Sequence, residues 1–386
     1  ISLILGIFFF NTSFFYQYLV PPILWDKTIF IFRDWQVILS AANCSNLGYD
    51  VYSNNPCDPL KSLHVYGSIL LKLPIKDFLQ YFYLKALPLT INGFFVILIL
   101  LNFQFNNKID YLIIFLFLLS PSTLLLLERF NIDIFIFIVI ILISYFRSNV
   151  VSYLLIMLVS MAKFYPIVLS IFFIIRNNNN LKRILFFLTT VISFLIFVFY
   201  EREAIVKIIN NQPQFTAYIT TNFSIFAIKN FVDKYYNLNW YIILFFFLLS
   251  NIIFTVYFIK KYEKNFFNSE KIDEYKEILF ILGVFILIFT YYIFSNFYYR
   301  EIYIFFLIPL LLKKIRSDKN PFCKYFLYLI CARYTFFIFM YHFIVFDPKG
   351  IFLFIKLFLD LLIMFYVLTF FLYTNIFIIK KKIKLL

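Results

Sequence analysis

The chain has 386 residues, of which 63% are hydrophobic and only 14% are charged, and its mean hydropathy is +0.88. The formal net charge is +15, but Lys and Arg fall in short clusters between apolar runs and form no stripe interleaved with exposed aromatic residues. This pattern argues against nucleic-acid binding, and it is typical of the cytoplasmic loops of a polytopic membrane protein.

Apolar runs long enough to cross a bilayer as helices recur along the whole chain. No linker rich in Gly, Ser or Pro divides them, so the sequence predicts an all-α fold in a single membrane domain, residues 1–386. About twelve crossings, with both termini inside, place every basic cluster on the cytoplasmic side. The predicted crossings are 1–20, 82–101, 111–127, 132–146, 150–162, 166–175, 184–200, 240–259, 278–294, 302–312, 326–345 and 351–379.

The sequence begins at Ile1, already inside the first apolar run. We therefore expect the cytoplasmic flank of the first helix to precede this residue. The stretch "LVPPILW" that follows the run lacks a small-residue cleavage pattern, so no cleavable signal peptide is expected.

The polar segments that break the cytoplasmic pattern all face the opposite side of the predicted membrane. The largest is an outer loop, residues 21–81, in which the amphipathic stretch after Arg33 predicts a helix along the interface. Residues 201–239 form a second outer loop. The shorter outward segments are 128–133, 163–166, 295–301 and 346–350. Any chemistry is expected on this extracytoplasmic face, which we take to be the periplasmic side of a bacterial inner membrane.

Cys44 and Cys57 bracket a polar segment of the first outer loop, and Gly48, Asn55 and Pro56 favour a chain reversal within it. An oxidising compartment allows two such thiols to form a disulfide. Closing a loop of this length stabilises a fold by roughly 3 kcal/mol. Two unpaired thiols are the alternative, because the chain also places cysteines inside apolar runs.

Asp34 follows an apolar stretch and stands at the start of the predicted interfacial helix. Its alternative role is an ordinary helix N-cap. The stretch "LLLLERFNIDIF" then places Glu128, Arg129, Asn131 and Asp133 between two apolar runs. Ionisable groups at membrane depth usually face the protein interior or an aqueous cavity. Neutralisation of Arg129 by its acidic neighbours is the alternative there.

Lys163 lies at the tip of a predicted helical hairpin, where Pro166 prevents simple continuation of the helix. A lysine buried among apolar residues needs an anion, whereas a lysine at the interface can snorkel to water. Arg300 lies at the outer end of another hairpin, and its planar guanidinium suits phosphate oxygens. The alternatives for this segment are an internal pair with Glu301 or an aromatic belt at the interface.

Taken together, Asp34 supplies a carboxylate base, while Arg129, Lys163 and Arg300 supply cations on the same side of the membrane. A base and several cations at one face suit a reaction on a phosphate-linked lipid. The expected partners are therefore the bilayer, a lipid-linked donor and an acceptor at the outer face.

These motifs resemble those of the C-type (GT-C) integral-membrane glycosyltransferases, particularly the polyprenol-phosphate-mannose-dependent branch in glycosyltransferase family 87. The similarity runs from about Arg33 to Arg183, and beyond it only "FYYRE" matches. The matching stretches, in chain order, are "DWQVILSAA", "GYDVY", "LLLLERFNIDIFIF" and "LLIMLVSMAKFYPIVL".

The resemblance implies transfer of a mannose-like hexose or a pentose from a polyprenyl phosphate to a hydroxyl of a lipid or glycan, with inversion at the anomeric carbon. The first-loop aspartate of such enzymes is the general base, which corresponds to Asp34 here. Lys163, Arg300 and Arg129 are the candidates for holding the phosphate of the donor.

Where family members often have a Gly-Asp-Pro-Tyr run, this chain has "GYDVY", so Asp50 and Tyr52 match only loosely. Asp50 therefore remains a rival to Asp34 as the base. Asp50, Tyr52, Glu128 and Asp133 are candidates for contacts with the acceptor or for support of the site. We expect the insert between the two outer-loop cysteines to shape acceptor specificity.

The sequence requires no cofactor. His64 and His342 are the two histidines of the chain, and no Cys or His spacing matches a zinc site. Asp50 and Asp58 could bind a divalent cation through oxygen ligands, although nothing in their spacing requires one. The chain lacks a Gly-rich phosphate loop, which disfavours a nucleotide-sugar donor held by a soluble fold.

Three other functions compete with the transferase. An O-antigen-type polysaccharide polymerase or ligase would use the loop 201–239, and Arg202 or Lys207 would then be essential in place of Asp34. A multi-pass transporter would place its charges near the midplane and show an internal repeat, which the sequence lacks. A structural scaffold would leave the outward cations with local pairing alone.

Overall fold

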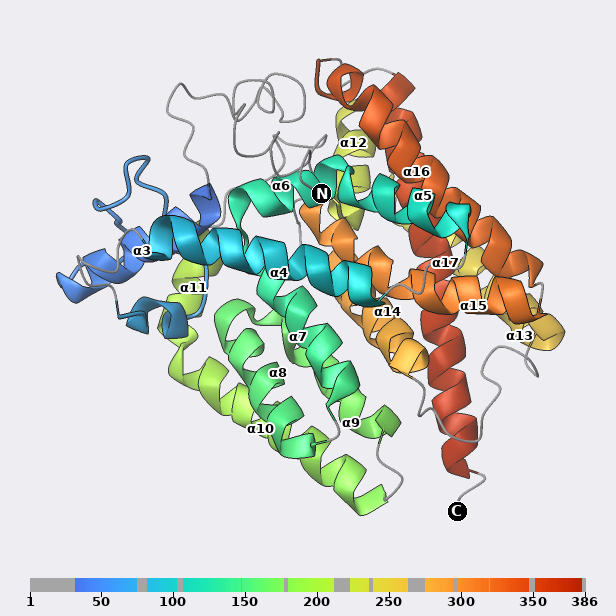
Figure 1. The fold of residues 1–386 in the computed structure, drawn as a ribbon, viewed down its shortest axis with the longest axis horizontal. Coiled ribbons are helices and arrows are strands. Elements are labelled where there is room, and N and C mark those ends of the chain that lie inside the picture. Colours follow the sequence, from blue (N-terminus) through green and yellow to red (C-terminus); the bar gives the residue numbers. More distant parts are fainter. Residues whose placement is uncertain are drawn as a thin grey trace.

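The computed structural model describes residues 32–74, 82–102, 107–146, 148–176, 180–211, 223–235, 239–262, 275–293, 298–318, 320–346 and 351–383. Over these ranges the fold is all-α, and no strand occurs (Figure 1). The predicted crossing 1–20 and residues 347–350 of the predicted outward segment 346–350 lie outside the described residues.

Six helices within the described ranges are long and apolar enough to cross a membrane. They coincide with six of the predicted crossings, and several carry exposed apolar side chains, such as Phe199, Phe245 and Phe246, which are 60–67% exposed. Lipid is the natural environment for such faces, so the fold is compatible with a multi-pass integral membrane protein. The six are η4 with α4 (Phe82–Ala86, Leu87–Asn102), α10 (Asn180–Tyr200), α13 (Trp240–Tyr262), α14 (Tyr275–Ile293), α16 (Pro321–Phe346) and α17 (Ile351–Ile383).

The predicted crossing 111–127 is a bent pair of helices. Helices α5 (Lys108–Leu118) and α6 (Pro121–Arg129) meet at an angle of 51° and together could form a seventh span. The bend has a local cause, because the Ser120 side chain accepts a hydrogen bond from the Thr123 amide and Pro121 occupies the first helical turn. Both features begin a new helix.

Three further predicted crossings are short. The 15 residues of α8 (Asn149–Lys163) measure only about 22 Å, against a hydrocarbon core of about 30 Å. Helix α7 (Asp133–Tyr145) is shorter still, and 166–175 is divided between η5 (Tyr165–Ser170) and α9 (Ile171–Arg176). The described residues therefore do not reach the predicted twelve crossings.

The predicted crossing 302–312 is also divided, between a 3₁₀-helix, η8 (Tyr298–Leu307), and α15 (Ile308–Asp318). Element η8 lies in the packed interior, because Phe305 and Phe306 stack on the rings of Phe117 and Phe137 at centroid distances of 4.2 and 4.3 Å. This central position brings its polar residues to the site described below.

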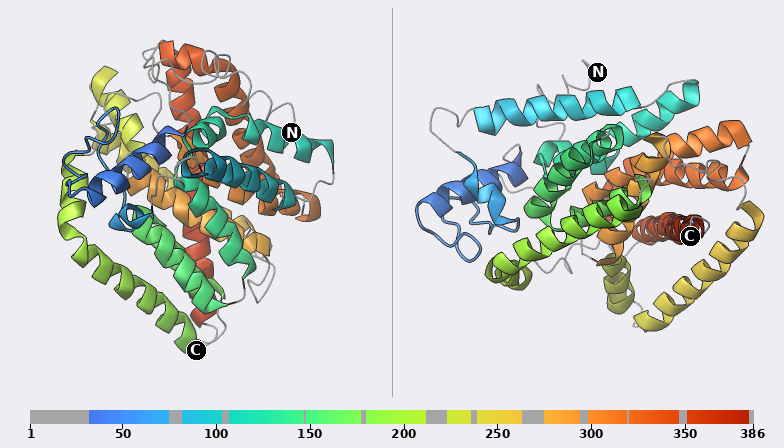
Figure 2. Two further views of the ribbon diagram at one scale, coloured as in Figure 1. Left: turned by 60° about the vertical axis from the view of Figure 1, so that its left-hand side comes forward. Right: turned by 90° about the horizontal axis from the view of Figure 1, so that it is seen from below.

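The two predicted outer loops contact each other. The first contains α3 (Arg33–Asn46) and η2 (Ser68–Lys72), and the second contains α11 (Arg202–Asn211) and α12 (Ile225–Tyr235). Asp50 accepts a hydrogen bond from Lys207 at 2.8 Å, and Glu201 accepts one from Ser68 at 2.5 Å. Helices α3 and α11 accordingly lie close together (Figures 1 and 2).

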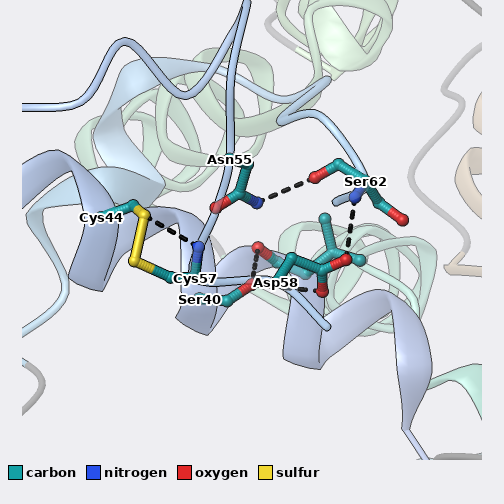
Figure 3. Close-up of a disulfide and its surroundings, with 7 residues drawn as sticks. Ser40, Cys44, Asn55, Cys57, Asp58 and Ser62 are labelled. Carbon is teal, nitrogen blue, oxygen red and sulfur yellow. Dashed lines mark hydrogen bonds between the residues drawn. A yellow bond between two sulfur atoms is a disulfide. The ribbon is translucent and has the colours of Figure 1, made fainter. Parts of the chain in front are cut away.

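Cys44 and Cys57 form the expected disulfide, which closes the first outer loop against α3 (Figure 3). Beside it, Arg33 donates two hydrogen bonds to the buried carboxylate of Asp58 at 2.5 and 2.6 Å. Asp58 also accepts from the Ser62 amide at 2.8 Å. These contacts fix the loop to the first turn of α3, the turn that carries Asp34.

Candidate functional site

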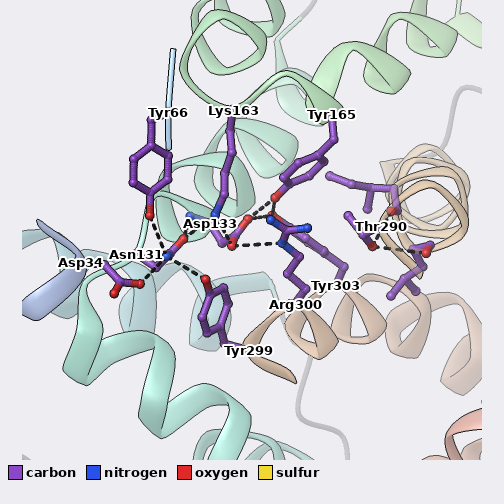
Figure 4. Close-up of polar contacts among 12 residues, drawn as sticks. Asp34, Tyr66, Asn131, Asp133, Lys163, Tyr165, Thr290, Tyr299, Arg300 and Tyr303 are labelled. Atoms are coloured by element: carbon purple, nitrogen blue, oxygen red, sulfur yellow. Dashed lines mark hydrogen bonds and ion pairs between the residues drawn. The ribbon is translucent and has the colours of Figure 1, made fainter. Parts of the chain in front are cut away.

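Polar side chains from four separate parts of the chain meet at one cluster (Figure 4). The start of α3 contributes Asp34, the α6–α7 junction contributes Asn131 and Asp133, the end of α8 contributes Lys163, and η8 contributes Arg300. Arg129 of α6 also lies beside Asp34. The predicted base and all three predicted phosphate-binding cations are thus brought together in space.

The backbone is strained at three of the junctions that supply these residues. Phe32, Phe130 and Phe164 have φ angles of 64°, 47° and 58°, a region that L-residues rarely adopt. They immediately precede α3, follow α6 and follow α8. Strain of this kind persists only where the surrounding structure enforces it, and it concentrates at functional sites.

Asn131 is the centre of the cluster. Its amide nitrogen lies 2.5 Å from Asp34 Oδ2, 2.9 Å from the Tyr299 hydroxyl and 3.2 Å from the Tyr66 hydroxyl. Its amide oxygen accepts a hydrogen bond from Lys163 Nζ at 2.6 Å. One uncharged side chain therefore connects the carboxylate of Asp34 with the ammonium of Lys163.

Asp133 forms the buried end of the cluster, and its side chain has no exposed surface. It accepts hydrogen bonds from Lys163 at 2.7 Å, from the Tyr303 hydroxyl at 2.9 Å and from the Tyr165 hydroxyl. Arg300 Nε lies 3.5 Å away, and its guanidinium stands over the Tyr165 ring. Two cations thus compensate one buried carboxylate, as a buried charge requires.

Arg300 keeps hydrogen-bonding capacity. Its Nε and Nη1 atoms are buried and have no hydrogen-bond acceptor within the described ranges. Buried donors without an acceptor are costly, and a guanidinium presents such donors in a fixed planar fork. These donors therefore suit an anionic group of a ligand.

Asp34 and Arg129 form the accessible end. Arg129 Nη1 lies 3.3 Å from Asp34 Oδ1, and each side chain is 19% exposed, in contrast to Asp133. Asp34 is in the first turn of α3, while Phe32 occupies the N-cap position without a side-chain hydrogen bond. Asp34 is therefore not the N-cap, and its carboxylate faces the cluster.

The other expected residues lie as follows. Asp50 is 44% exposed and pairs with Lys207, whose hydrogen bond lowers the pKa of its carboxyl. Tyr52 packs beside Cys44 in a small separate core and points its hydroxyl at the Tyr66 carbonyl, 3.4 Å away. The structure therefore does not place Asp50 in the Asp34 cluster.

The structure agrees with one of the sequence alternatives and differs from two others. Glu128 does lie beside Arg129, 3.5 Å from its Nε, so partial neutralisation holds there. Lys163 is only 9% exposed and reaches Asp133, so it does not snorkel to water. Glu301 pairs with Arg333 and not with Arg300, because neighbouring residues of η8 point in different directions.

The hydroxyls of the site were not predicted from the sequence. They come from Tyr66, Tyr165, Tyr299 and Tyr303. For the tyrosines of "FYYRE" the sequence offered an aromatic belt as an alternative, and no local pattern distinguishes a belt from hydroxyls that line a site. Nor was a buried charge group of Glu301, Arg333, Lys356 and Asp360 predicted. There a signal existed, because Arg333, Lys356 and Asp360 interrupt long apolar helices.

Among the described residues, no group of three or more His, Cys, Asp or Glu side chains could hold a metal ion. Asp50 and Asp58, the oxygen ligands considered from the sequence, are each engaged by a basic partner, Lys207 and Arg33.

No family model, curated protein or solved structure matches the chain.

Proposed function

We propose that the protein is a GT-C-type membrane glycosyltransferase that moves a mannose-like hexose or a pentose from a polyprenyl phosphate to a hydroxyl of a lipid or glycan acceptor. The observation that carries the proposal is the accessible Asp34 carboxylate, held by Arg129 and Asn131 next to the buried cations Lys163 and Arg300. A base and cations at one site are what transfer from a phosphate-linked sugar needs.

In the proposed reaction, the acceptor hydroxyl gives its proton to Asp34 while its oxygen attacks the anomeric carbon. The bond from that carbon to the phosphate oxygen breaks on the opposite face, so the configuration inverts, and the polyprenyl phosphate leaves with the bonding electrons. Arg129 and Arg300 offer cationic donors for the growing charge on the phosphate. Within the described ranges, the buried Nε and Nη1 of Arg300 have no hydrogen-bond acceptor.

Lys163 and Asp133 are assigned to support. Asp133 is fully buried and accepts hydrogen bonds from Lys163, Tyr165 and Tyr303, so it has no free position for an acceptor proton. Lys163 contacts both Asp133 and Asn131, and Asn131 in turn holds Asp34. In this assignment the buried end of the cluster orients the accessible end.

The periplasmic face of a bacterial inner membrane is the proposed location of the site. The Cys44–Cys57 disulfide supports an extracytoplasmic position, because disulfides persist in oxidising compartments. Cys44 of the disulfide lies on α3, the same helix that carries Asp34. The loop and the site would then face the same compartment.

The polymerase or ligase remains the competing enzyme. It would rely on Arg202 or Lys207, but Lys207 pairs with Asp50, and Arg202 lies over the ring of Phe199 at 5.3 Å. Neither contact belongs to the Asp34 cluster, which favours the transferase.

The experiment that tests this proposal is a donor survey. Membranes containing the protein are supplied with radiolabelled hexoses and pentoses, each carried on polyprenyl phosphate, and label is followed into lipid and glycan. Transfer from at least one monophosphate-linked sugar, undiminished by Arg202→Gln or Lys207→Gln, supports the transferase. No transfer from any of these donors contradicts it. Loss of transfer in the Arg202 or Lys207 variants alone would favour the polymerase.

A further inference from the structure

A second group of charges is buried next to the site. Arg333 of α16 donates to Glu301 Oε1 at 2.7 Å and to Asp360 Oδ1 of α17 at 2.5 Å, and Lys356 lies 3.0 Å from Asp360. All four side chains are at most 3% exposed. Two carboxylates and two cations compensate each other, so the group tolerates its burial.

Element η8 connects this buried group to the candidate site. A 3₁₀-helix has three residues per turn, so residues three apart point in the same direction and neighbours point about 120° apart. Arg300 and Tyr303, three residues apart, both face Asp133. Glu301, the neighbour of Arg300, faces Arg333 on the other side (Figure 4 shows the Arg300 side).

The neighbours of η8 leave it little freedom. A Cβ atom at Gly283 of α14 would lie only 2.7 Å from the Cβ of Phe306, so α14 packs directly against η8. The Tyr334 hydroxyl of α16 lies 3.5 Å from the Glu301 carbonyl oxygen. A ten-residue 3₁₀-helix is unusually long. Rotation about its axis would move Glu301 away from the Arg333 guanidinium that donates to it.

We propose that Glu301 and Arg333 are positioning residues that fix the rotation of η8 and so hold Arg300 against Asp133, with its Nη1 donor open to the phosphate of the donor. Arg333 belongs to α16 and Glu301 to η8, so their pair joins the helix bundle to the site. The role of Arg300 in binding the donor phosphate rests on the proposed function, whereas the link between the two charge groups does not.

The test compares two double variants that each remove one buried pair and keep the charge balanced. Glu301→Gln/Arg333→Met removes the link to η8 and leaves the Lys356–Asp360 pair. Lys356→Met/Asp360→Asn is the matched control, which leaves the Glu301–Arg333 pair. Each is combined with Arg300→Met, and thermal unfolding is measured on the full chain in detergent.

We call Glu301→Gln/Arg333→Met the unlinked variant. If the Glu301–Arg333 pair holds Arg300 in place, Arg300→Met lowers the melting temperature of the unlinked variant by at most about half as much as it lowers that of the wild-type chain. The reason is that the effects of coupled residues are non-additive. In the control background the effect of Arg300→Met is unchanged. Equal, additive shifts in all three backgrounds overturn the proposal. This arm needs no substrate, so it decides the link even if no sugar is transferred.

The second arm measures transfer. The unlinked variant is expected to raise the KM for the polyprenyl-phosphate donor about tenfold while kcat per folded protein changes less, the signature of lost binding. The KM for the acceptor stays unchanged, and the control variant shows neither effect. An unchanged donor KM in the unlinked variant, or an equal rise in the control, overturns the role in donor binding and leaves the proposed transferase activity intact.

Discussion

At the residue scale, the candidate site depends on a hierarchy of burial. Asp133 has no exposed side-chain surface, Lys163 and Arg300 have 9% and 11%, and Asp34 and Arg129 have 19% each. Charges that are buried must be compensated, and charges that are accessible can exchange protons with a substrate. This gradient separates the supporting carboxylate from the proposed base.

Asp133→Asn is expected to destabilise the protein strongly. The substitution leaves Lys163 and Arg300 buried without their carboxylate, and breaking a buried pair costs roughly 3–5 kcal/mol. The matched control is Asp50→Asn, which breaks an exposed pair with Lys207 and should cost less than about 1 kcal/mol. Unfolding of purified protein in detergent measures both. Similar losses for the two variants would contradict the burial gradient.

Part of the site could be predicted from the sequence. Asp34, Arg129, Lys163 and Arg300 stand out because ionisable residues interrupt apolar runs, and such residues rarely lack a role. The connecting role of Asn131 could not be predicted, because Asn131 contacts Asp34 and Tyr299, which are 97 and 168 residues away in the sequence. Separations of that size are set by the packing of helices, which hydropathy does not encode.

At the element scale, close backbone contacts position the segments that carry the site. Gly67 donates its amide hydrogen to the Ala162 carbonyl at 3.0 Å, directly before Lys163. A Cβ at Gly67 would lie 1.8 Å from the Met161 carbonyl oxygen, so only glycine fits there. This contact places Tyr66 over the end of α8, where its hydroxyl reaches Asn131.

Gly67→Ala should therefore displace the outer loop from α8, lowering both the melting temperature and sugar transfer. Gly93→Ala is the control, because no atom lies within 4 Å of a Cβ there and Gly93 is within α4. Alanine is favoured over glycine in helices by about 1 kcal/mol, so the control should not lose stability. Equal tolerance of both alanines would refute the tight contact at Gly67.

Acid should destabilise the first outer loop. Burial lowers the pKa of His64 to about 4, so between pH 6.5 and pH 4 the unfolded chain binds a proton that the folded loop excludes. For Asp58, burial alone would raise the carboxyl pKa, but the hydrogen bonds from Arg33 and Ser62 outweigh it and the net pKa is lowered. Its stabilisation is thus also lost as the pH falls below about 4.

Both groups act in the same direction, so the melting temperature should fall as the pH is lowered from 6.5 toward 4. His64→Phe, which can keep the edge contacts with Tyr52 and Tyr66, should remove most of this dependence. The same pH profile in the variant and in the wild-type protein would show that His64 is not the responsible group.

Helix boundaries show where sequence reasoning succeeds and fails. The long apolar helices α10, α13, α14, α16 and α17 could be predicted because their length and hydropathy suffice. The bend between α5 and α6 had a readable signal in Ser120 and Pro121, the cap and first-turn residues of a new helix. The 3₁₀ geometry of η8 had no such signal, because apolar residues fill every side of it.

At the scale of the whole molecule, polar pairs join segments that are far apart in the chain. Residues predicted to be outward contact one another, as in the pairs Asp50–Lys207 and Ser68–Glu201. Near the predicted cytoplasmic ends of α5 and α15, Arg316 pairs with Asp110. These pairs join segments separated by more than 100 residues, so they constrain the topology as a whole.

Labelling with a membrane-impermeant maleimide tests the direction of insertion. In a chain with Cys323 and Cys331 replaced by serine, Glu203→Cys on α11 should react in intact spheroplasts. Ile109→Cys at the start of α5 should react only after the membrane is permeabilised. Both positions are exposed in the fold. The reverse pattern would place the Asp34 cluster in the cytoplasm and contradict the proposed periplasmic site.

The most direct test of the proposed function is sugar transfer by the Asp34→Asn variant. Membranes with equal amounts of folded wild-type, Asp34→Asn and Asp50→Asn protein are given the radiolabelled polyprenyl-phosphate sugar that the wild-type chain uses. Loss of a general base typically lowers the rate by about 10²–10⁴-fold, so transfer should nearly vanish in Asp34→Asn and persist in Asp50→Asn. Undiminished transfer by Asp34→Asn would contradict the assignment of Asp34 as the base.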